Sequence, residues 1–159
     1  MEPKVEENVT LTVRPSKPGD CVYLEKHLRE ADRNEVQATL GKCDLEALLL
    51  SWSYTKDPYT IFKGETPAGV FGVAPFEPGI GCIWLLGTDD LVRCRWSFLR
   101  QSRHWMNHVS SGFQLLFNYV DERNTVHIKW IEWLGFTFIA RHEKHGYEQR
   151  PFLEFVRIV

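Results

Sequence analysis

The pattern of apolar and polar positions predicts a strand, a helix and a second strand between residues 113 and 140. The apolar run 113–120 is short and rich in β-favouring side chains, which predicts a buried strand. From Val126 onward, apolar residues recur at helical spacing. Gly135 then predicts the end of the helix, because glycine adopts the left-handed conformation of a helix C-terminus without steric strain. Residues 136–140 begin the next strand.

The rest of the chain continues this succession of strand and helix patterns. Further strands are predicted at 9–14, 59–63, 68–74, 82–86 and 152–158. Further helices are predicted at 21–28, at 31–40, from 44 onward and, as one long helix, at 89–109. Loops are predicted at 76–81, which contains Pro and Gly, and at the polar stretch 141–149. This order is mixed α/β, with one strand–helix–strand crossover in an otherwise hairpin-connected sheet.

The composition supports one domain covering residues 1–159. A chain of this length buries about two thirds of its unfolded surface when it folds. Hydrophobic residues make up 43% of the chain and aromatic residues 13%. These fractions argue against a disordered chain and predict a large aromatic core.

Charge and cysteine usage give no support to several classes of function. The net charge of −2 provides no argument for binding to nucleic acid or to an anionic membrane. No apolar run approaches the roughly 18 residues of a membrane span, so no transmembrane segment is expected. The four cysteines have no metal-ligand spacing, so no metal site is predicted and we interpret them as reduced and mostly buried. The alternative is a reactive thiol at Cys82 on a central strand.

One segment resembles the last motif of a known superfamily. Asn124 stands eleven residues before Gly135, and Leu134-Gly135-Phe136 closes the helix. This pattern resembles that of the GNAT superfamily of N-acetyltransferases. The wider chain, including LREADRNEVQAT and WLLGTDDL, is similar to the GNAT-like internal virion protein A family of short-tailed phages. The resemblance implies a mostly antiparallel central sheet that splays into a V and is flanked by helices.

The resemblance also implies a cofactor, acetyl-CoA, lying in that V beside the central strand. The coenzyme's pyrophosphate would sit at the N-terminus of the next helix, where unpaired N–H groups attract anions. The residues that the resemblance assigns to cofactor binding are Leu85, Leu86, Gly87, Thr88 and Asn124.

Three positions depart from the pattern of active GNAT members. Asp89 and Asp90 stand where two negative phosphates would go. They either stabilise the first turn of the helix or repel the pyrophosphate. Ile131 stands where active members often have the Tyr that protonates the departing thiolate, and it cannot donate a proton.

No residue is a clear catalytic group. Tyr119 and Tyr147 are weak candidates for the missing acid, although a tyrosine is often simply packed with its hydroxyl satisfied. Glu132 is a weak candidate for a base, although charged side chains are mostly surface residues. Other groups that could reach the cleft or its rim are Glu77, His127, His142, Glu30 and Asp32.

Two functions remain open from the sequence. The first is a phage-encoded, acetyl-CoA-dependent N-acetyltransferase acting on an amine of a protein or a small molecule. The second is an inactive GNAT-like module that binds a virion or host protein through Trp and Arg residues on the long helix. The N-terminus has no apolar signal core, so the host cytoplasm or the virion interior is the expected location. Free N–H groups at 87–91 beside an open V favour the first function, and Trp or Phe rings filling the V favour the second.

Overall fold

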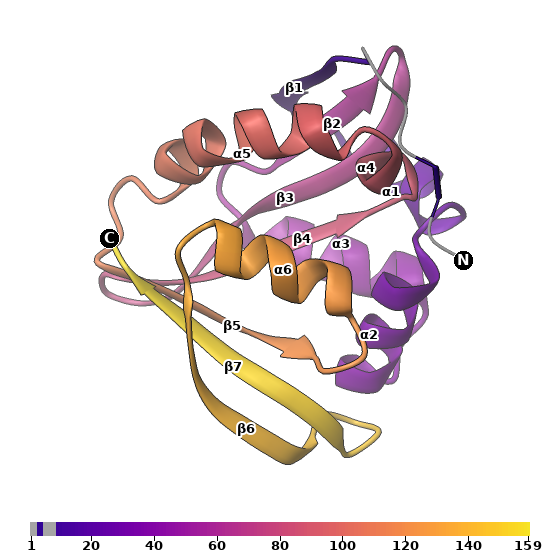
Figure 1. Ribbon diagram of the computed structural model, residues 1–159. Coiled ribbons are helices and arrows are strands. Elements are labelled where there is room, and N and C mark those ends of the chain that lie inside the picture. Colours follow the sequence, from indigo (N-terminus) through magenta and orange to yellow (C-terminus); the bar gives the residue numbers. More distant parts are fainter. Residues whose placement is uncertain (1–2, 5–8) are drawn as a thin grey trace.

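The computed structural model describes residues 3–4 and 9–159. Seven strands form one sheet with the spatial order β1-β2-β3-β4-β5-β7-β6 (Figure 1). The strands are β1 (Leu11–Pro15), β2 (Tyr59–Lys63), β3 (Thr66–Glu77), β4 (Ile80–Gly87), β5 (Leu115–Asp121), β6 (Thr137–His145) and β7 (Arg150–Ile158). The helices are α1 (Pro18–Glu25), α2 (Glu30–Leu40), α3 (Asp44–Tyr54), α4 (Asp90–Arg93), α5 (Arg95–Val109) and α6 (Thr125–Trp133). The mixed α/β class and the order of elements predicted from the sequence are confirmed.

The sheet is antiparallel except where β4 lies beside β5. These two strands are parallel, as the strand–helix–strand crossover requires, and they pair at only three positions. The pairs are Ile80 with Leu115, Gly81 with Leu116 and Cys82 with Phe117. Beyond this short seam the two strands diverge, which produces the V-shaped splay that was predicted.

Helices cover both faces of the sheet. The helices α1 to α3 lie behind the sheet in Figure 1, where Leu24 and Leu48 pack with Val70 of β3. The helices α4 to α6 lie in front, where Leu91 and Trp130 pack with other buried residues. Each helix thus buries one apolar face against the sheet, in the way that amphipathic helices of layered α/β proteins do.

The predicted long helix is interrupted at Cys94. Its φ of −102° and ψ of 28° are not helical, so α4 ends at Arg93 and α5 starts at Arg95. The break accompanies burial of the apolar side chains of this turn, since Leu91, Val92 and Cys94 are at most 3% exposed. Helical periodicity alone did not reveal the break, because both pieces carry compatible apolar spacing.

Two predicted loops are hairpins instead. Between β3 and β4 the chain turns at Gly79, whose φ is +77°, and a register shift next to Pro75 accommodates the missing N–H of proline. The stretch 141–149 was predicted as a polar loop, yet β6 continues to His145 and pairs with β7. β6 is an edge strand whose side chains alternate between exposed and half-buried, so polar residues are compatible with it.

Among the described residues, no helix is long and apolar enough to cross a membrane.

Candidate functional site

The diverging ends of β4 and β5 enclose a cavity of about 370 Å³, which we call the V cavity. Its walls come from these two strands, from α2 and α3 on one face of the sheet, and from α5 and α6 on the other. The lining is mostly apolar, and Glu35 of α2 contributes to its polar part. A hollow of this size is within the range of small-molecule sites, roughly 300–1,000 Å³.

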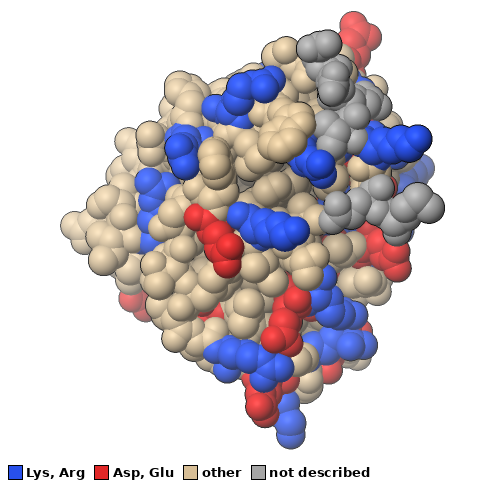
Figure 2. All heavy atoms as spheres, in the orientation of Figure 1, with Lys and Arg blue, Asp and Glu red and all other residues tan. Residues whose placement is uncertain are grey.

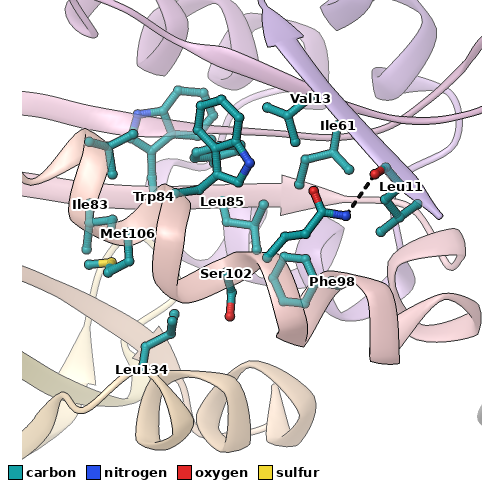
Figure 3. Close-up of a pocket in the computed structure, with 14 residues that line it drawn as sticks. Leu11, Val13, Ile61, Ile83, Trp84, Leu85, Phe98, Ser102, Met106 and Leu134 are labelled. Atoms are coloured by element: carbon teal, nitrogen blue, oxygen red, sulfur yellow. Dashed lines mark hydrogen bonds between the residues drawn. The ribbon is translucent and has the colours of Figure 1, made fainter.

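A smaller apolar hollow of about 90 Å³ lies between α5 and the strands β1 to β4 (Figure 3). It shares Leu85 and Phe98 with the V cavity. The side chain of Gln101 donates a hydrogen bond to the carbonyl of Leu11 at 2.8 Å. With few polar groups in its lining, this hollow is an incompletely filled part of the core.

One edge of β4 faces the V cavity. The Asn118 side chain of β5 bridges the splay, because its Nδ2 donates to the carbonyl of Ile83 at 2.5 Å. Backbone groups of a strand point alternately to its two edges, so the N–H and C=O of Leu85 face the same side as those of Ile83. No described residue on that side bonds to Leu85. The N–H and C=O of Leu85 are therefore free at this edge of β4, beside the cavity.

The next peptide on this edge, that of Gly87, is already occupied. Its N–H donates to Oδ2 of Asp32 at 2.9 Å, and this carboxylate is completely buried. Its carbonyl accepts from the N–H of Arg29 at 2.9 Å. The turn between α1 and α2 therefore closes over the end of β4.

Of the N–H groups that follow Gly87, those of Thr88, Asp90 and Leu91 have acceptors within the protein, whereas no described residue accepts from the N–H of Asp89. The N–H of Thr88 donates to the carbonyl of Ala68 at 2.8 Å. The N–H groups of Asp90 and Leu91 donate to Oγ1 and the carbonyl of Thr88, both at 3.2 Å. The helix that begins here has only four residues, so it provides a weak dipole at most.

Asn124 points toward α2. It is 1% exposed, and its Nδ2 donates to Oδ1 of Asp32 at 3.1 Å and to Oε2 of Glu35 at 2.9 Å. It precedes α6, but its side chain makes no capping hydrogen bond to that helix. A single carboxylate, that of Asp32, thus binds both Gly87 and Asn124.

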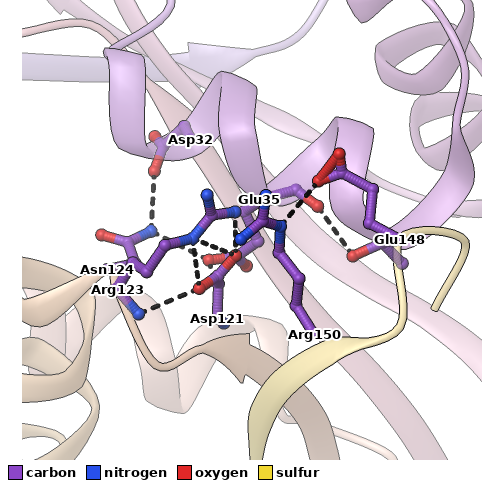
Figure 4. Close-up of polar contacts among 8 residues, drawn as sticks. Asp32, Glu35, Asp121, Arg123, Asn124, Glu148 and Arg150 are labelled. Carbon is purple, nitrogen blue, oxygen red and sulfur yellow. Dashed lines mark hydrogen bonds and ion pairs between the residues drawn. The ribbon is translucent and has the colours of Figure 1, made fainter. Parts of the chain in front are cut away.

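Three carboxylates, those of Asp32, Glu35 and Asp121, form what we call the carboxylate cluster (Figure 4). Asp32 forms an ion pair with Arg29 at 3.1 Å, and Asp121 forms one with Arg123 at 2.6 Å. Burial raises the pKa of Glu35 to about 8, and the charge of Asp32 adds to the effect. The hydrogen bonds that Glu35 accepts from Asn124 and from the N–H of Asp121 oppose this rise but do not cancel it.

His127 lies against the same cluster. It lines the V cavity, and its Nε2 is 3.4 Å from Oδ1 of Asp32. Burial lowers its pKa, and the nearby Arg29 acts in the same direction, although the charge of Asp32 acts against it. We therefore treat this imidazole as neutral.

Aromatic rings close the V on the side of α5 and α6. Phe98 of α5 and Trp130 of α6 are in contact, with ring centroids 4.6 Å apart. Trp130 is only 7% exposed, and Arg29 lies over its ring at 5.8 Å. These side chains fill the space between the two helices.

The residues assigned to the cofactor from the sequence gather around the V. Leu85 and Leu86 line the cavity. Gly87 and Thr88 lie at the end of β4, with their N–H groups bonded as described above. Asn124 lies across the mouth of the V from Gly87, joined to it through Asp32.

The three weak catalytic candidates do not lie together, and only one of them lines the V cavity. Tyr119 lines the V cavity, and its hydroxyl lies 3.4 Å from Oε1 of Glu154. Tyr147 is 74% exposed, and Glu132 is exposed on α6. Neither of these two residues lines the cavity, whereas Ile131 does.

Sequence reasoning missed Glu35 and placed Asp32 only at the rim. A signal existed, because Asp32 and Val36 are four residues apart and share one face of α2. Since Val36 is buried, a carboxylate on the same face must also be buried and must find hydrogen-bond donors.

Trp and Arg side chains of α5 and α6 pair on the protein surface, and Figure 2 shows several basic side chains on the face that these helices cover. Arg95 lies over Trp96 at 5.3 Å, and Arg103 lies over Trp133 at 4.3 Å. Trp96 is 53% exposed and Trp133 is 45% exposed. Residues 91–120 contain no Asp or Glu, so α5 is basic without internal compensation.

Comparisons with known proteins establish the fold. No protein-family model matches the chain, and no curated protein sequence does. Three similar solved structures are a GNAT-family acetyltransferase from Streptococcus pneumoniae, a ribosomal L7/L12 alpha-N-protein acetyltransferase and a spermidine N-acetyltransferase from Vibrio cholerae. Their TM-scores are 0.62, 0.69 and 0.66, at 13%, 16% and 11% identity. The matches cover 94%, 98% and 94% of this chain and 99%, 97% and 95% of the others.

The chain therefore has the fold of the GNAT acyl-CoA N-acyltransferases. Two of these similar structures contain coenzyme A, and one of the two also contains spermine. The similarity to the internal virion protein family stays a prediction from the sequence.

The residues present do not fit a coenzyme held in the manner that the resemblance implied. Gly87 and Asn124, the two donors on either side of the mouth, are both bound to Asp32. Asp90 forms ion pairs with Arg93 at 3.1 Å and with Lys63 at 3.7 Å. The two nearby positive charges are therefore already balanced by a carboxylate of the protein. The N–H and C=O of Leu85 and the N–H of Asp89 remain free, but the N–H groups of Gly87, Thr88, Asp90 and Leu91 are bonded within the protein.

Proposed function

We propose that this chain is a GNAT-fold binding protein in which internal side chains occupy the groups that a coenzyme would need. The observation that carries the proposal is the buried carboxylate of Asp32, bonded to both Gly87 and Asn124. The contact between Phe98 and Trp130 supports it from the opposite face of the sheet.

The free energies of the hydrogen bonds to Asp32 favour this proposal over coenzyme binding. Hydrogen bonds to charged groups contribute about 1.5–3 kcal/mol each. Asp32 accepts three of them, from Gly87, Asn124 and Arg29. Releasing the bonds from Gly87 and Asn124 would cost about 3–6 kcal/mol of the roughly 8 kcal/mol that a micromolar ligand provides. The carboxylate would also be left near an incoming phosphate of the same charge.

The proposed partner is a protein of the virion or of the host. The exposed surface formed by Trp96, Trp133, Arg95 and Arg103 supports an acidic partner, since Trp and Arg are enriched among residues that dominate binding energy. A phage origin, and a location in the host cytoplasm or the virion interior, rest on the sequence resemblance alone.

A second candidate function is acetyl-CoA-dependent N-acetyl transfer to an amine of a protein or a small molecule. The V cavity and the free N–H and C=O of Leu85 favour it, because they leave room beside β4 for a ligand. This function would require α2 to release Gly87 and Asn124.

Isothermal titration with acetyl-CoA and with CoA distinguishes the two functions. We expect no heat and no thermal shift of the protein at millimolar ligand. Micromolar binding that weakens in Asn124→Ala would overturn the proposal and establish the transferase instead. Glu30→Gln serves as the control variant, since Glu30 is an exposed residue at the start of α2.

A further inference from the structure

Three arginines of α5 differ from the other arginines that the structure describes. The side chains of Arg95, Arg100 and Arg103 form no ion pair and no hydrogen bond with a described residue. Every described arginine outside α5 binds a carboxylate or a backbone carbonyl of the protein. The helix α5 therefore carries the arginines whose N–H donors have no acceptor in the described part of the chain.

These side chains belong to one exposed stripe. Trp96, Arg100 and Arg103 are all exposed and follow one another at spacings of four and three residues, which places them on one face of the helix. Trp133 of α6 lies beside this face, because Arg103 lies over its ring at 4.3 Å. We call these four side chains, together with Arg95, the Trp–Arg surface. The stripe extends roughly 10 Å along α5, since a helix rises about 1.5 Å per residue.

Two of the guanidinium groups are positioned by tryptophan rings. Arg95 lies over Trp96, and Arg103 lies over Trp133. A guanidinium over an aromatic ring still has N–H donors along its edges, and these match both oxygens of a carboxylate. The two rings are 53% and 45% exposed, so they present apolar area next to the donors. The surface therefore fits a ligand that carries carboxylates beside apolar groups.

The charges around the surface favour a protein segment over a nucleic acid. Each tryptophan ring already has an arginine against it, which leaves less of the ring for stacking with a base. Glu132 is exposed on α6 next to Trp133, with Lys129 one turn before it. A nucleic acid carries a negative charge at every nucleotide and would meet Glu132, whereas a protein segment can place its carboxylates at selected positions.

A second copy of this chain does not supply the complementary charges. Six exposed carboxylates of the described residues form no ion pair, and they are Glu30, Asp57, Glu65, Glu77, Asp89 and Glu132. No two of them lie on the same helix, and Glu65 and Glu77 lie at opposite ends of β3. Among the described residues there is thus no row of unpaired carboxylates at helical spacing. The matching partner is a different protein.

We propose that the Trp–Arg surface binds an acidic amphipathic helix of another protein. Carboxylates one turn apart on that helix would accept hydrogen bonds from Arg100 and Arg103, and its apolar side chains would pack on Trp96 and Trp133. A helix suits this surface because its residues three and four apart repeat at the same spacing as the stripe on α5. The inference rests on the proposed function, since it names the kind of partner that a binding protein of this fold would dock.

The test is calorimetric titration of the full chain with a designed helical peptide of 15 residues, the length of α5. The peptide has Glu along one stripe, Leu along the adjacent stripe, Ala elsewhere and no basic residue. One control peptide has Gln in place of each Glu, and the other has the same composition in scrambled order. We expect the Glu peptide to bind at least tenfold more tightly than the Gln peptide and at least threefold more tightly than the scrambled one. Its affinity should fall severalfold as salt rises, because exposed charges are screened.

Variants of the protein locate the binding surface. Arg100→Gln and Trp96→Ala should each weaken binding of the Glu peptide at least fivefold. The matched controls are Lys56→Gln and Phe76→Ala, which change exposed side chains outside α5 and α6 and should bind as the unchanged protein does. All four side chains are exposed, and thermal unfolding curves check that each variant folds.

Several outcomes would overturn the proposal. They include no binding of the Glu peptide at millimolar concentration, equal binding of the Glu and Gln peptides, equal binding of the scrambled peptide, and unchanged binding by Arg100→Gln. Tighter binding of a single-stranded DNA of similar length would assign the surface to a phosphate backbone instead. A dimer of the protein alone that Arg100→Gln dissociates, measured by sedimentation equilibrium, would assign it to a second copy.

The peptide titration and the coenzyme titration fail independently. Binding of both acetyl-CoA and the Glu peptide would refute the proposed function and leave the Trp–Arg surface as a docking site. Binding of neither would refute the docking site and leave the engaged groups around Asp32 as proposed.

Discussion

Asp32 of α2 and Gly87 of β4 are joined by a buried hydrogen bond of 2.9 Å, although 55 residues separate them in the chain. Through this bond a helix on one face of the sheet reaches the free edge of its central strand. The same carboxylate extends to Asn124, which lies beyond β5. The mouth of the V is thus closed by a side chain of the protein itself.

The first prediction concerns the stability that Asp32 contributes. Asp32→Asn removes the charge that pairs with Arg29, a residue only 6% exposed, and leaves that guanidinium without its counter-ion. We expect the free energy of unfolding to fall by about 3 kcal/mol or more, as for other buried ion pairs that lose one partner. Urea unfolding measures it. The exposed Asp57→Asn should change stability by less than about 0.5 kcal/mol, and a similar small effect at Asp32 would contradict our view of the network.

The second prediction separates a packing role of Gly87 from a ligand-binding role. A Cβ at this position would meet the side chain of Leu91 and would lie 3.0 Å from the carbonyl of Ala68. We expect Gly87→Ala to destabilise the protein by about 1–3 kcal/mol, since overpacking forces neighbours to move. Gly19→Ala is the matched control, because nothing lies within 4 Å of its Cβ. If both variants unfold at the same urea concentration, Gly87 is not required for packing.

The third prediction is a decrease of stability with rising pH that depends on Glu35. Its pKa is about 8 in the folded protein against 4.5 as a free side chain, so the folded state binds more protons between these values. Stability should therefore fall as pH rises from 4.5 to 8 and should level off above 8, by at most about 1.4 kcal/mol per pH unit. Glu35→Gln should remove this component. Parallel urea midpoints for both proteins at pH 6, 7, 8 and 9 would refute it.

The fourth prediction concerns the stability of the protein at acidic pH, which depends on His127. Its pKa is lowered by burial, so the unfolded chain binds a proton at this imidazole more readily than the folded protein does. The stability associated with its neutral form is present above pH 6.5 and is lost as pH falls below that value. Titration of the histidine ring signals by NMR tests this directly. A midpoint for His127 at or above 6.5 would contradict it.

The fifth prediction concerns the thiols. Burial raises the pKa of Cys21 and of Cys82 to about 11, with the charge of Asp20 adding to the effect at Cys21, whereas Cys43 is exposed. A disulfide reagent at pH 8 should modify Cys43 first and these two roughly a hundredfold more slowly, since only the thiolate reacts. Cys43→Ser should remove the fast phase. Fast modification of Cys82 in that variant would restore the hypothesis of a reactive thiol.

Much of the fold could be predicted because its signals are local. The left-handed turn at Gly135, with a φ of +83°, and the strand Tyr59–Lys63 follow from residue types within a few positions. The extension of β6 to His145 could not be predicted in this way. Its pairing with β7 is what makes the polar stretch a strand, and such pairing is not visible in the periodicity of one segment.

For the candidate site, too, the sequence predicts some features and not others. The positions of Leu85, Gly87 and Asn124 around the V follow from the fold, which the sequence resemblance anticipated. What these residues bond to depends on α2, whose Asp32 lies 55 residues from Gly87 and 92 from Asn124. A pattern of charges within α2 indicates burial, but it does not identify the donors that the buried carboxylate will find.

The short seam between β4 and β5 has a consequence for how the chain folds. Strands β1 to β4 come from residues 11–87, and strands β5 to β7 come from residues 115–158. Each half of the sheet is thus built from one contiguous stretch and can pair its own strands first. The three residue pairs of the seam bring these stretches together and gain little until both are formed. The V therefore marks the boundary between two folding units, and we expect their union to be a late step.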